Sequence, residues 1–201
     1  MCIRDRYSYW YFPSALPINM CDNIIKAGKA ARFNKATTGN NKKATAEVQK
    51  KRKSNVSWLN DKWIYNLIHP YIHTANRNAG WNFQWDWSES CQFTIYKPGQ
   101  FYDWHCDSWS KPYEKEGHNK GKIRKLSVTV SLSDPKDYTG GELEFKPIDN
   151  NTGKQYKQTC KEILPKGSIC VFPSHVWHRV KPVKKGTRYS LVIWSCGWPF
   201  K

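Results

Sequence analysis

The chain has 201 residues, eleven of them tryptophan, and a formal net charge of +17 at pH 7. This length suits a single domain, and a hydrophobic content of 39% is enough to fill a core. No apolar run approaches the roughly 20 residues that a membrane-spanning helix needs, and no secretory signal is visible. The charge indicates an acidic partner, either nucleic acid, an acidic protein or an anionic small molecule, unless the basic surface is only solvated.

The first six residues, MCIRDR, resemble an in-frame translation of the transposon-end adapter used in sequencing-library preparation. We therefore expect residues 1–6 to be a non-native leader, Cys2 to be an artefact and the native start to be missing. The other six cysteines show no C-x-x-C spacing. They predict reduced thiols in a cytoplasmic protein.

Two amphipathic helices are predicted before residue 88, over residues 16–33 and 56–80. In the second, a buried stripe of core side chains is expected at Trp58, Trp63, Leu67 and Tyr71. We expect both helices to support one sheet. The segment 26–54 carries ten lysines and arginines against the single acid Glu47, which predicts a loop-rich, solvated region.

Eight short strands follow, each marked by a period-two pattern and separated by turns rich in glycine and proline. They are predicted at residues 91–97, 101–107, 124–133, 141–145, 160–164, 168–172, 177–183 and 187–194. This density of strands and turns is typical of a double-sheet jelly roll. The predicted fold is therefore mainly β with flanking helices.

Within these strands, His105 and Asp107 are two residues apart, so one face of a strand would present an imidazole beside a carboxylate. A His-x-Asp pair is common by chance, but His178 supplies a second imidazole. Two histidines and one carboxylate form the facial triad that holds non-haem Fe(II) with positions left open. His175 competes with His178 for this role, although strand alternation places it on the opposite face.

Arg188 adds a cation to the same predicted face. A hairpin with its turn at Lys184–Gly186 would set Pro182 opposite Arg188, Val180 opposite Ser190 and His178 opposite Val192. A surface salt bridge on an edge strand is the alternative for the arginine. An inward guanidinium, however, needs an anion, and it forms two parallel hydrogen bonds with a carboxylate. Together with the metal, Arg188 indicates a clamp for 2-oxoglutarate.

These motifs resemble those of the Fe(II)/2-oxoglutarate-dependent dioxygenases of the prolyl 4-hydroxylase-like superfamily. The resemblance covers roughly residues 88–199, through YKPGQFYDWHCD, TGGELEF and FPSHVWHRVKPVKKGTRYSLVIW. It implies a distorted double-stranded β-helix, with Tyr96 and Ser190 helping Arg188 to hold 2-oxoglutarate and Trp194 lining its pocket. Collagen-type prolyl hydroxylases carry lysine at the position of Arg188, and this departure weakens a collagen-like assignment.

The resemblance further implies oxidative decarboxylation of 2-oxoglutarate to succinate and CO₂, coupled to hydroxylation of a C–H bond, with L-ascorbate rescuing oxidised iron. It divides the chain into a helical support region with a basic loop, 7–87, and a dioxygenase core, 88–199. The loop 108–124, with Trp109 and Tyr113, would close over the substrate.

Three functions remain open from the sequence. The first is hydroxylation of a peptidyl residue, with proline leading by resemblance. The second is the same chemistry on nucleic acid, by hydroxylation or demethylation, or on a free amino acid, and the basic surface favours it somewhat. The third is a non-catalytic metal-binding jelly roll that acts as a binding module, although the intact triad and arginine argue against it.

Overall fold

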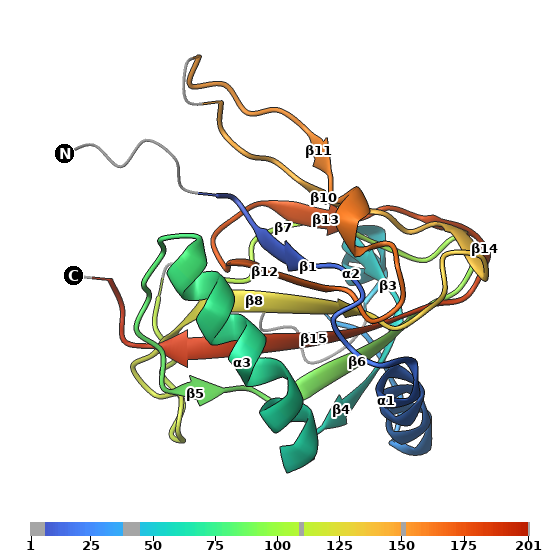
Figure 1. Ribbon diagram of the computed structural model, residues 1–201, viewed down its shortest axis with the longest axis horizontal. Coiled ribbons are helices and arrows are strands. Elements are labelled where there is room, and N and C mark those ends of the chain that lie inside the picture. Colours follow the sequence, from blue (N-terminus) through green and yellow to red (C-terminus); the bar gives the residue numbers. More distant parts are fainter. Residues whose placement is uncertain (1–6, 38–44, 109–110, 150–151, 201) are drawn as a thin grey trace.

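Two antiparallel sheets form the centre of the computed structural model, which describes residues 7–37, 45–108, 111–149 and 152–200 (Figure 1). The expected leader, residues 1–6, lies outside the described residues, as does Trp109. The strands confirm the mainly β fold with flanking helices. No helix among the described residues is long and apolar enough to cross a membrane.

The larger sheet carries the longest strands, β8 and β15, side by side in its middle. In spatial order it contains β1 (Trp10–Phe12), β12 (Ile169–Pro173), β8 (Ile123–Ser131), β15 (Arg188–Gly197), β6 (Cys91–Tyr96), β4 (Asn55–Leu59) and β2 (Asn34–Lys35), while β5 (Trp87–Ser88) pairs with one end of β15.

The smaller sheet is built from short strands, in the order β11 (Gln158–Thr159), β10 (Leu143–Phe145), β13 (His178–Val180), β7 (Phe101–His105) and β3 (Arg52–Lys53). A separate pair joins β14 (Val183–Gly186) to β9 (Tyr138–Gly140). The two main sheets face each other, because side chains from both line one cavity.

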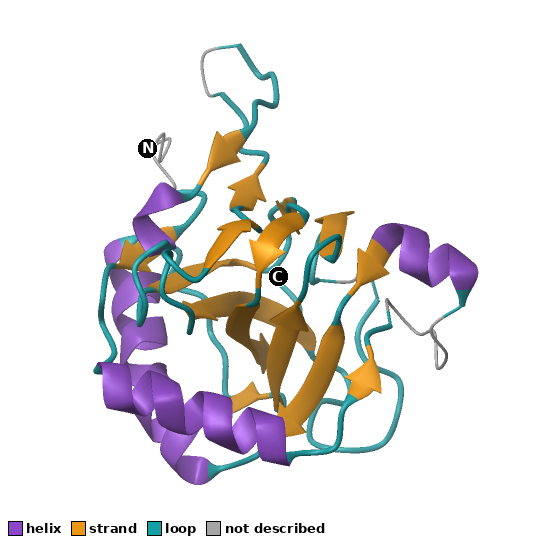
Figure 2. Cartoon of the chain, turned by 90° about the vertical axis from the view of Figure 1, so that its right-hand side faces the viewer, coloured by secondary structure: helices purple, strands orange, loops and turns teal. Residues whose placement is uncertain are grey.

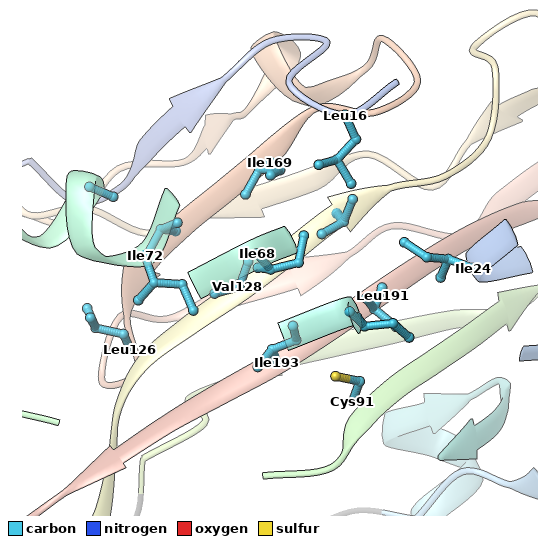
Figure 3. Packing of buried hydrophobic residues seen from close by; sticks show 14 of the residues in the cluster. Leu16, Ile24, Ile68, Ile72, Cys91, Leu126, Val128, Ile169, Leu191 and Ile193 are labelled. Atoms are coloured by element: carbon cyan, nitrogen blue, oxygen red, sulfur yellow. The ribbon is translucent and has the colours of Figure 1, made fainter. Parts of the chain in front are cut away.

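Helices α1 (Ile18–Ala30) and α3 (Lys62–Asn78) lie together on one side of the strands, away from the short α2 (Ala46–Lys51) (Figure 2). Their apolar faces cover the larger sheet, as the sequence predicted. Figure 3 shows Ile68 and Ile72 of α3 over Val128 and Ile193 of the sheet. The opposite face of this sheet is thereby left free to line the cavity.

The second predicted helix is wrong over its first residues, because residues 55–59 form strand β4 and α3 begins only at Lys62. The predicted stripe is also displaced. Trp58 lies in β4 and is exposed, whereas the buried side chains of α3 are Ile64, Ile68, Ile72 and Ala75. Trp63, Leu67 and Tyr71 are only partly buried beside them.

The strand predicted at 160–164 is a 3₁₀-helix, η1 (Lys161–Ile163). Its buried residues, Cys160 and Ile163, are three positions apart, which is the spacing of a helical turn and not of a strand face. The neighbouring strand β11 lies just before it.

The strand predicted at 177–183 is two strands in different sheets. β13 pairs with β10 and β7, whereas β14 pairs with β9, so the expected hairpin between 177–183 and 187–194 does not form. The break falls at Lys181 and Pro182. Proline has no N–H for a continuing ladder, and the carbonyl of Pro182 instead accepts a hydrogen bond from Gly141.

Candidate metal centre

His105, Asp107 and His178 meet at one end of the cavity between the two sheets. His105 is the last residue of β7, Asp107 follows that strand, and His178 is the first residue of β13, paired directly with His105. One ligand atom from each lies within 4.8 Å of the others. Among the described residues, this is the one cluster of three or more such side chains.

Backbone carbonyls fix the orientation of both imidazole rings. Nδ1 of His105 lies 2.7 Å from the carbonyl of Asp103, and Nδ1 of His178 lies 2.9 Å from that of Val176. A carbonyl only accepts, so each Nδ1 carries the proton and each Nε2 presents a lone pair. Both Nε2 atoms face the carboxylate of Asp107, at 3.6 Å from His105 and 3.5 Å from His178.

The charge state of the cluster favours a cation at its centre. Burial, together with the neighbouring His178, lowers the pKa of His105 to about 3, so this ring is neutral at pH 7. The pKa of Asp107 falls to about 2 because His178, His105 and Arg124 outweigh the effect of burial, which alone would raise it. An ionised carboxylate and two imidazole lone pairs are the donor set of Fe(II) facial triads.

Arg188 begins β15 and is buried. Its Nη1 donates to the hydroxyl of Ser190 over 3.4 Å, and its guanidinium lies 5.6 Å from the ring centre of Tyr96. Among the described residues it has no carboxylate partner within 4.0 Å. A buried cation without a counter-ion is costly, which indicates that a bound anion completes it.

The glycine pair of the TGGELEF motif leaves room for this arginine. Gly141 has a φ of +69°, and a Cβ there would lie 3.0 Å from Cδ of Arg188 and 2.9 Å from Cγ2 of Val183. A larger residue would be strained in this backbone conformation and would press on the arginine.

Ser190, Tyr96 and Trp194, to which the resemblance gives a role in binding 2-oxoglutarate, line the cavity. Arg188 lies behind Ser190 and Tyr96. The indole Nε1 of Trp194 is buried, and among the described residues it makes no hydrogen bond of ordinary geometry. The guanidinium of Arg124 covers the Trp194 ring at 3.8 Å and is held by two 2.6 Å hydrogen bonds to Glu89. The N–H of Trp194 is close enough to Asp107 to help lower the pKa of that carboxyl.

Arg52 is a site residue that the sequence reasoning missed. It lies in β3, is buried, and lines the cavity with its guanidinium 4.4 Å from the ring centre of Tyr102. Tyr102 in turn stacks on His105 with ring centres 3.4 Å apart. Nη2 of Arg52 is buried without a partner among the described residues. Arg52 lies in a run of basic residues, which predicted that its side chain is exposed. No local sequence pattern distinguished Arg52 from the other basic residues of that run.

His175 lies outside the cluster. It is exposed, and its ring contacts Phe83 and Phe200. The predicted preference for His178 therefore agrees with the geometry, although the hairpin that led to it does not form.

The cavity itself is narrow, with a volume of about 30 Å³.

A sequence model of the 2OG-Fe(II) oxygenase superfamily matches residues 91–196, slightly more than half of the chain. The chain belongs to this superfamily. The matched span runs from the start of β6 nearly to the end of β15, and it contains the three clustered side chains and Arg188.

Curated relatives of this 2OG-Fe(II) oxygenase are PKHD-type hydroxylases. One from Synechococcus sp. (strain CC9902) is 41% identical over 97 residues, which are 48% of this chain and 36% of the relative. PKHD-type hydroxylase PiuC of Pseudomonas aeruginosa is 28% identical over 157 residues, which are 71% of this chain and 65% of the relative. The chain thus spans about a third to two thirds of these proteins.

Solved structures of similar fold include prolyl hydroxylases. The 2OG complex of a viral collagen prolyl hydroxylase from Paramecium Bursaria Chlorella virus-1 has a TM-score of 0.64 at 19% identity, covering 97% of this chain and 99% of that one. A prolyl-4-hydroxylase of Pseudomonas putida has a TM-score of 0.62 at 21% identity, covering 94% and 92%.

A third structure, a Trichoplax adhaerens prolyl hydroxylase in complex with a hypoxia-inducible factor peptide fragment, has a TM-score of 0.61 at 17% identity, covering 94% of this chain and 83% of that one. These likenesses confirm the predicted jelly roll of the 2OG oxygenases.

We predict that His178→Ala abolishes tight binding of Mn(II), used as a spectroscopic stand-in for Fe(II), because it removes one of three donors. His175→Ala is the matched control, and it should bind Mn(II) like the wild type. Electron paramagnetic resonance of free Mn(II) measures both affinities. Retention of binding by His178→Ala with loss in His175→Ala would reverse the assignment.

Proposed function

We propose that this protein is an Fe(II)- and 2-oxoglutarate-dependent dioxygenase that hydroxylates a C–H bond of a peptidyl residue, with release of succinate and CO₂. The observation that carries this proposal is the pairing of two features at one cavity. A His105, Asp107 and His178 cluster suited to Fe(II) lines the cavity. The buried Arg188, which has no counter-ion among the described residues, lies behind the lining residues Ser190 and Tyr96.

In this proposal His105, Asp107 and His178 hold the iron, and the remainder of the wall binds 2-oxoglutarate. Arg188 pairs with the carboxylate remote from the metal, through the bidentate geometry that guanidinium favours. Ser190 and Tyr96 flank this carboxylate, and Trp194 lies between it and the metal ligands. The bound iron would supply the activation of O₂ that couples decarboxylation to hydroxylation.

The protein's own contribution is orientation and exclusion of water. The carbonyls of Asp103 and Val176 keep both Nε2 lone pairs toward the metal position. Apolar side chains from both sheets surround the reacting centre, namely Leu143, Phe172, Val180 and Val192. Such a lining keeps the dielectric low and strengthens the ionic contacts within the cavity.

A peptide is the substrate class that the comparisons favour. The relatives are named as hydroxylases, and one structural neighbour holds a peptide fragment. Proline is the leading candidate for the residue that is hydroxylated. The loop after Asp107 is fastened near the cavity, because Tyr113 donates a 2.7 Å hydrogen bond to Glu89, which in turn holds Arg124. We propose that this loop covers the substrate.

L-Ascorbate would sustain turnover in this proposal by reducing oxidised iron.

Nucleic acid is the second candidate substrate, through hydroxylation or demethylation, because the net charge of +17 would attract a polyanion. A free amino acid would use the same chemistry. In a third possibility, the jelly roll binds metal without catalysis. The intact cluster and Arg188 support the enzyme over this binding module.

The test of the proposal is succinate formation by anaerobically purified protein supplied with Fe(II), 2-oxoglutarate and O₂. Slow turnover without substrate is expected in the wild type and none in Asp107→Ala. Stimulation by pooled proline-containing peptides, and not by nucleic acid or free amino acids, would support a peptidyl substrate. Absence of succinate from iron-loaded protein with every pool would favour the binding module.

Arg188→Ala should weaken 2-oxoglutarate binding about 10- to 100-fold, because hydrogen bonds to charged groups contribute roughly 1.5–3 kcal/mol. Mn(II) affinity should not change, since the arginine lies away from the three ligands. Lys184→Ala, which removes an exposed cation four residues earlier, is the matched control. Equal 2-oxoglutarate requirements in wild type and Arg188→Ala would contradict the clamp.

A further inference from the structure

Two buried serines lie directly behind the carboxylate of Asp107. Ser127 is in the middle of β8, and its hydroxyl lies 2.8 Å from Oδ2 of Asp107. Ser174 follows the last residue of β12, and its hydroxyl lies 2.9 Å from that of Ser127. Both serines are fully buried. Polar side chains at such positions are retained only where they form hydrogen bonds.

The direction of these hydrogen bonds follows from the protons available. The hydroxyl of Ser127 donates to Oδ2 of Asp107, because a carboxylate oxygen accepts hydrogen bonds. A hydroxyl has one proton, and that of Ser127 is used. Ser174 is therefore the donor to Ser127. The three groups form a chain from Ser174 to Ser127 to Asp107, in which each bond polarises the next.

The backbone of Ser174 holds the same residue from the other side. Its carbonyl accepts hydrogen bonds from the N–H groups of Asp107 and Ser108, each 2.9 Å long. Its own N–H donates to the backbone carbonyl of Lys125 over 3.0 Å. Asp107 lies beyond the end of β7 and outside its ladder. These contacts fix both the main chain and the carboxylate of Asp107 to the larger sheet, although His105 and His178 belong to the smaller one.

We propose that Ser127 and Ser174 are positioning residues that hold the carboxylate of Asp107 in its metal-binding orientation. The hydrogen bond to Oδ2 sets the rotation of the carboxylate, and Oδ1 faces His105. This inference rests on the proposed function, because it assumes that Asp107 binds the metal. The larger sheet would then align Asp107, although the two histidines belong to the smaller sheet.

Mn(II) affinity of the metal-free protein, measured anaerobically by electron paramagnetic resonance, tests this role without turnover. Ser127→Ala should weaken binding about 10- to 100-fold, the usual effect of removing a hydrogen-bond partner of a metal ligand. Ser174→Ala should show an intermediate affinity, because Ser127 still donates but loses its own donor. Ser127→Thr keeps the hydroxyl and should bind more tightly than Ser127→Ala.

Ser131→Ala is the matched control, because Ser131 is also buried in β8 but, among the described residues, its side chain makes no hydrogen bond with Asp107 or Ser174. It should bind Mn(II) like the wild type. Thermal unfolding of each metal-free variant shows whether weaker binding comes from a less stable fold or from a misaligned Asp107 carboxylate. If Ser127→Ala does not fold, Ser174→Ala decides the question.

The inference would be overturned if Ser127→Ala, or Ser174→Ala where that variant decides, bound Mn(II) as tightly as the wild type. The metal site would still be upheld in that case, provided that the wild type binds Mn(II) tightly and Asp107→Ala does not. Failure of the wild type itself to bind Mn(II) or Fe(II) would overturn both. The two failures are therefore distinguishable.

Discussion

The antiparallel pairing of β13 with β7 is the contact on which the site depends, because it places His178 directly opposite His105. Each histidine is then oriented by a carbonyl two residues earlier in its own segment, so the ladder also sets the direction of both lone pairs. The carboxylate reaches the same point from the far side of the cavity, held by Ser127 of the facing sheet. A shift of one residue in this ladder would turn His178 away from the cavity.

Asp107 and Arg188 are both buried, but they differ in how the protein compensates their charge. Asp107 accepts a hydrogen bond from Ser127 and lies beside both histidines, whereas Arg188 has no carboxylate partner within 4.0 Å among the described residues. A buried guanidinium without a counter-ion is costly, and an organic anion would supply that counter-ion.

Much of this could be predicted from the sequence, because alternation along a strand is a local property. The face of β15 that carries Arg188, Ser190 and Trp194 follows from that alternation, as do most of the eight strands predicted between residues 91 and 194. The partners of each strand are not a local property. The hairpin expected around Lys184–Gly186 was wrong because Pro182 diverts the chain to β14, which pairs with β9. Arg52 was missed because only the pairing of β3 with β7 brings it to the cavity.

The most direct test of the account is an anaerobic titration of the Fe(II)-loaded protein with 2-oxoglutarate, followed by visible absorption. Chelation of iron by the 2-oxo acid produces a charge-transfer band that neither component gives alone. The account predicts this band in the wild type, with saturation at one equivalent of 2-oxoglutarate per bound iron. Absence of the band from protein that has bound Fe(II) would show that the cluster and Arg188 do not form one site.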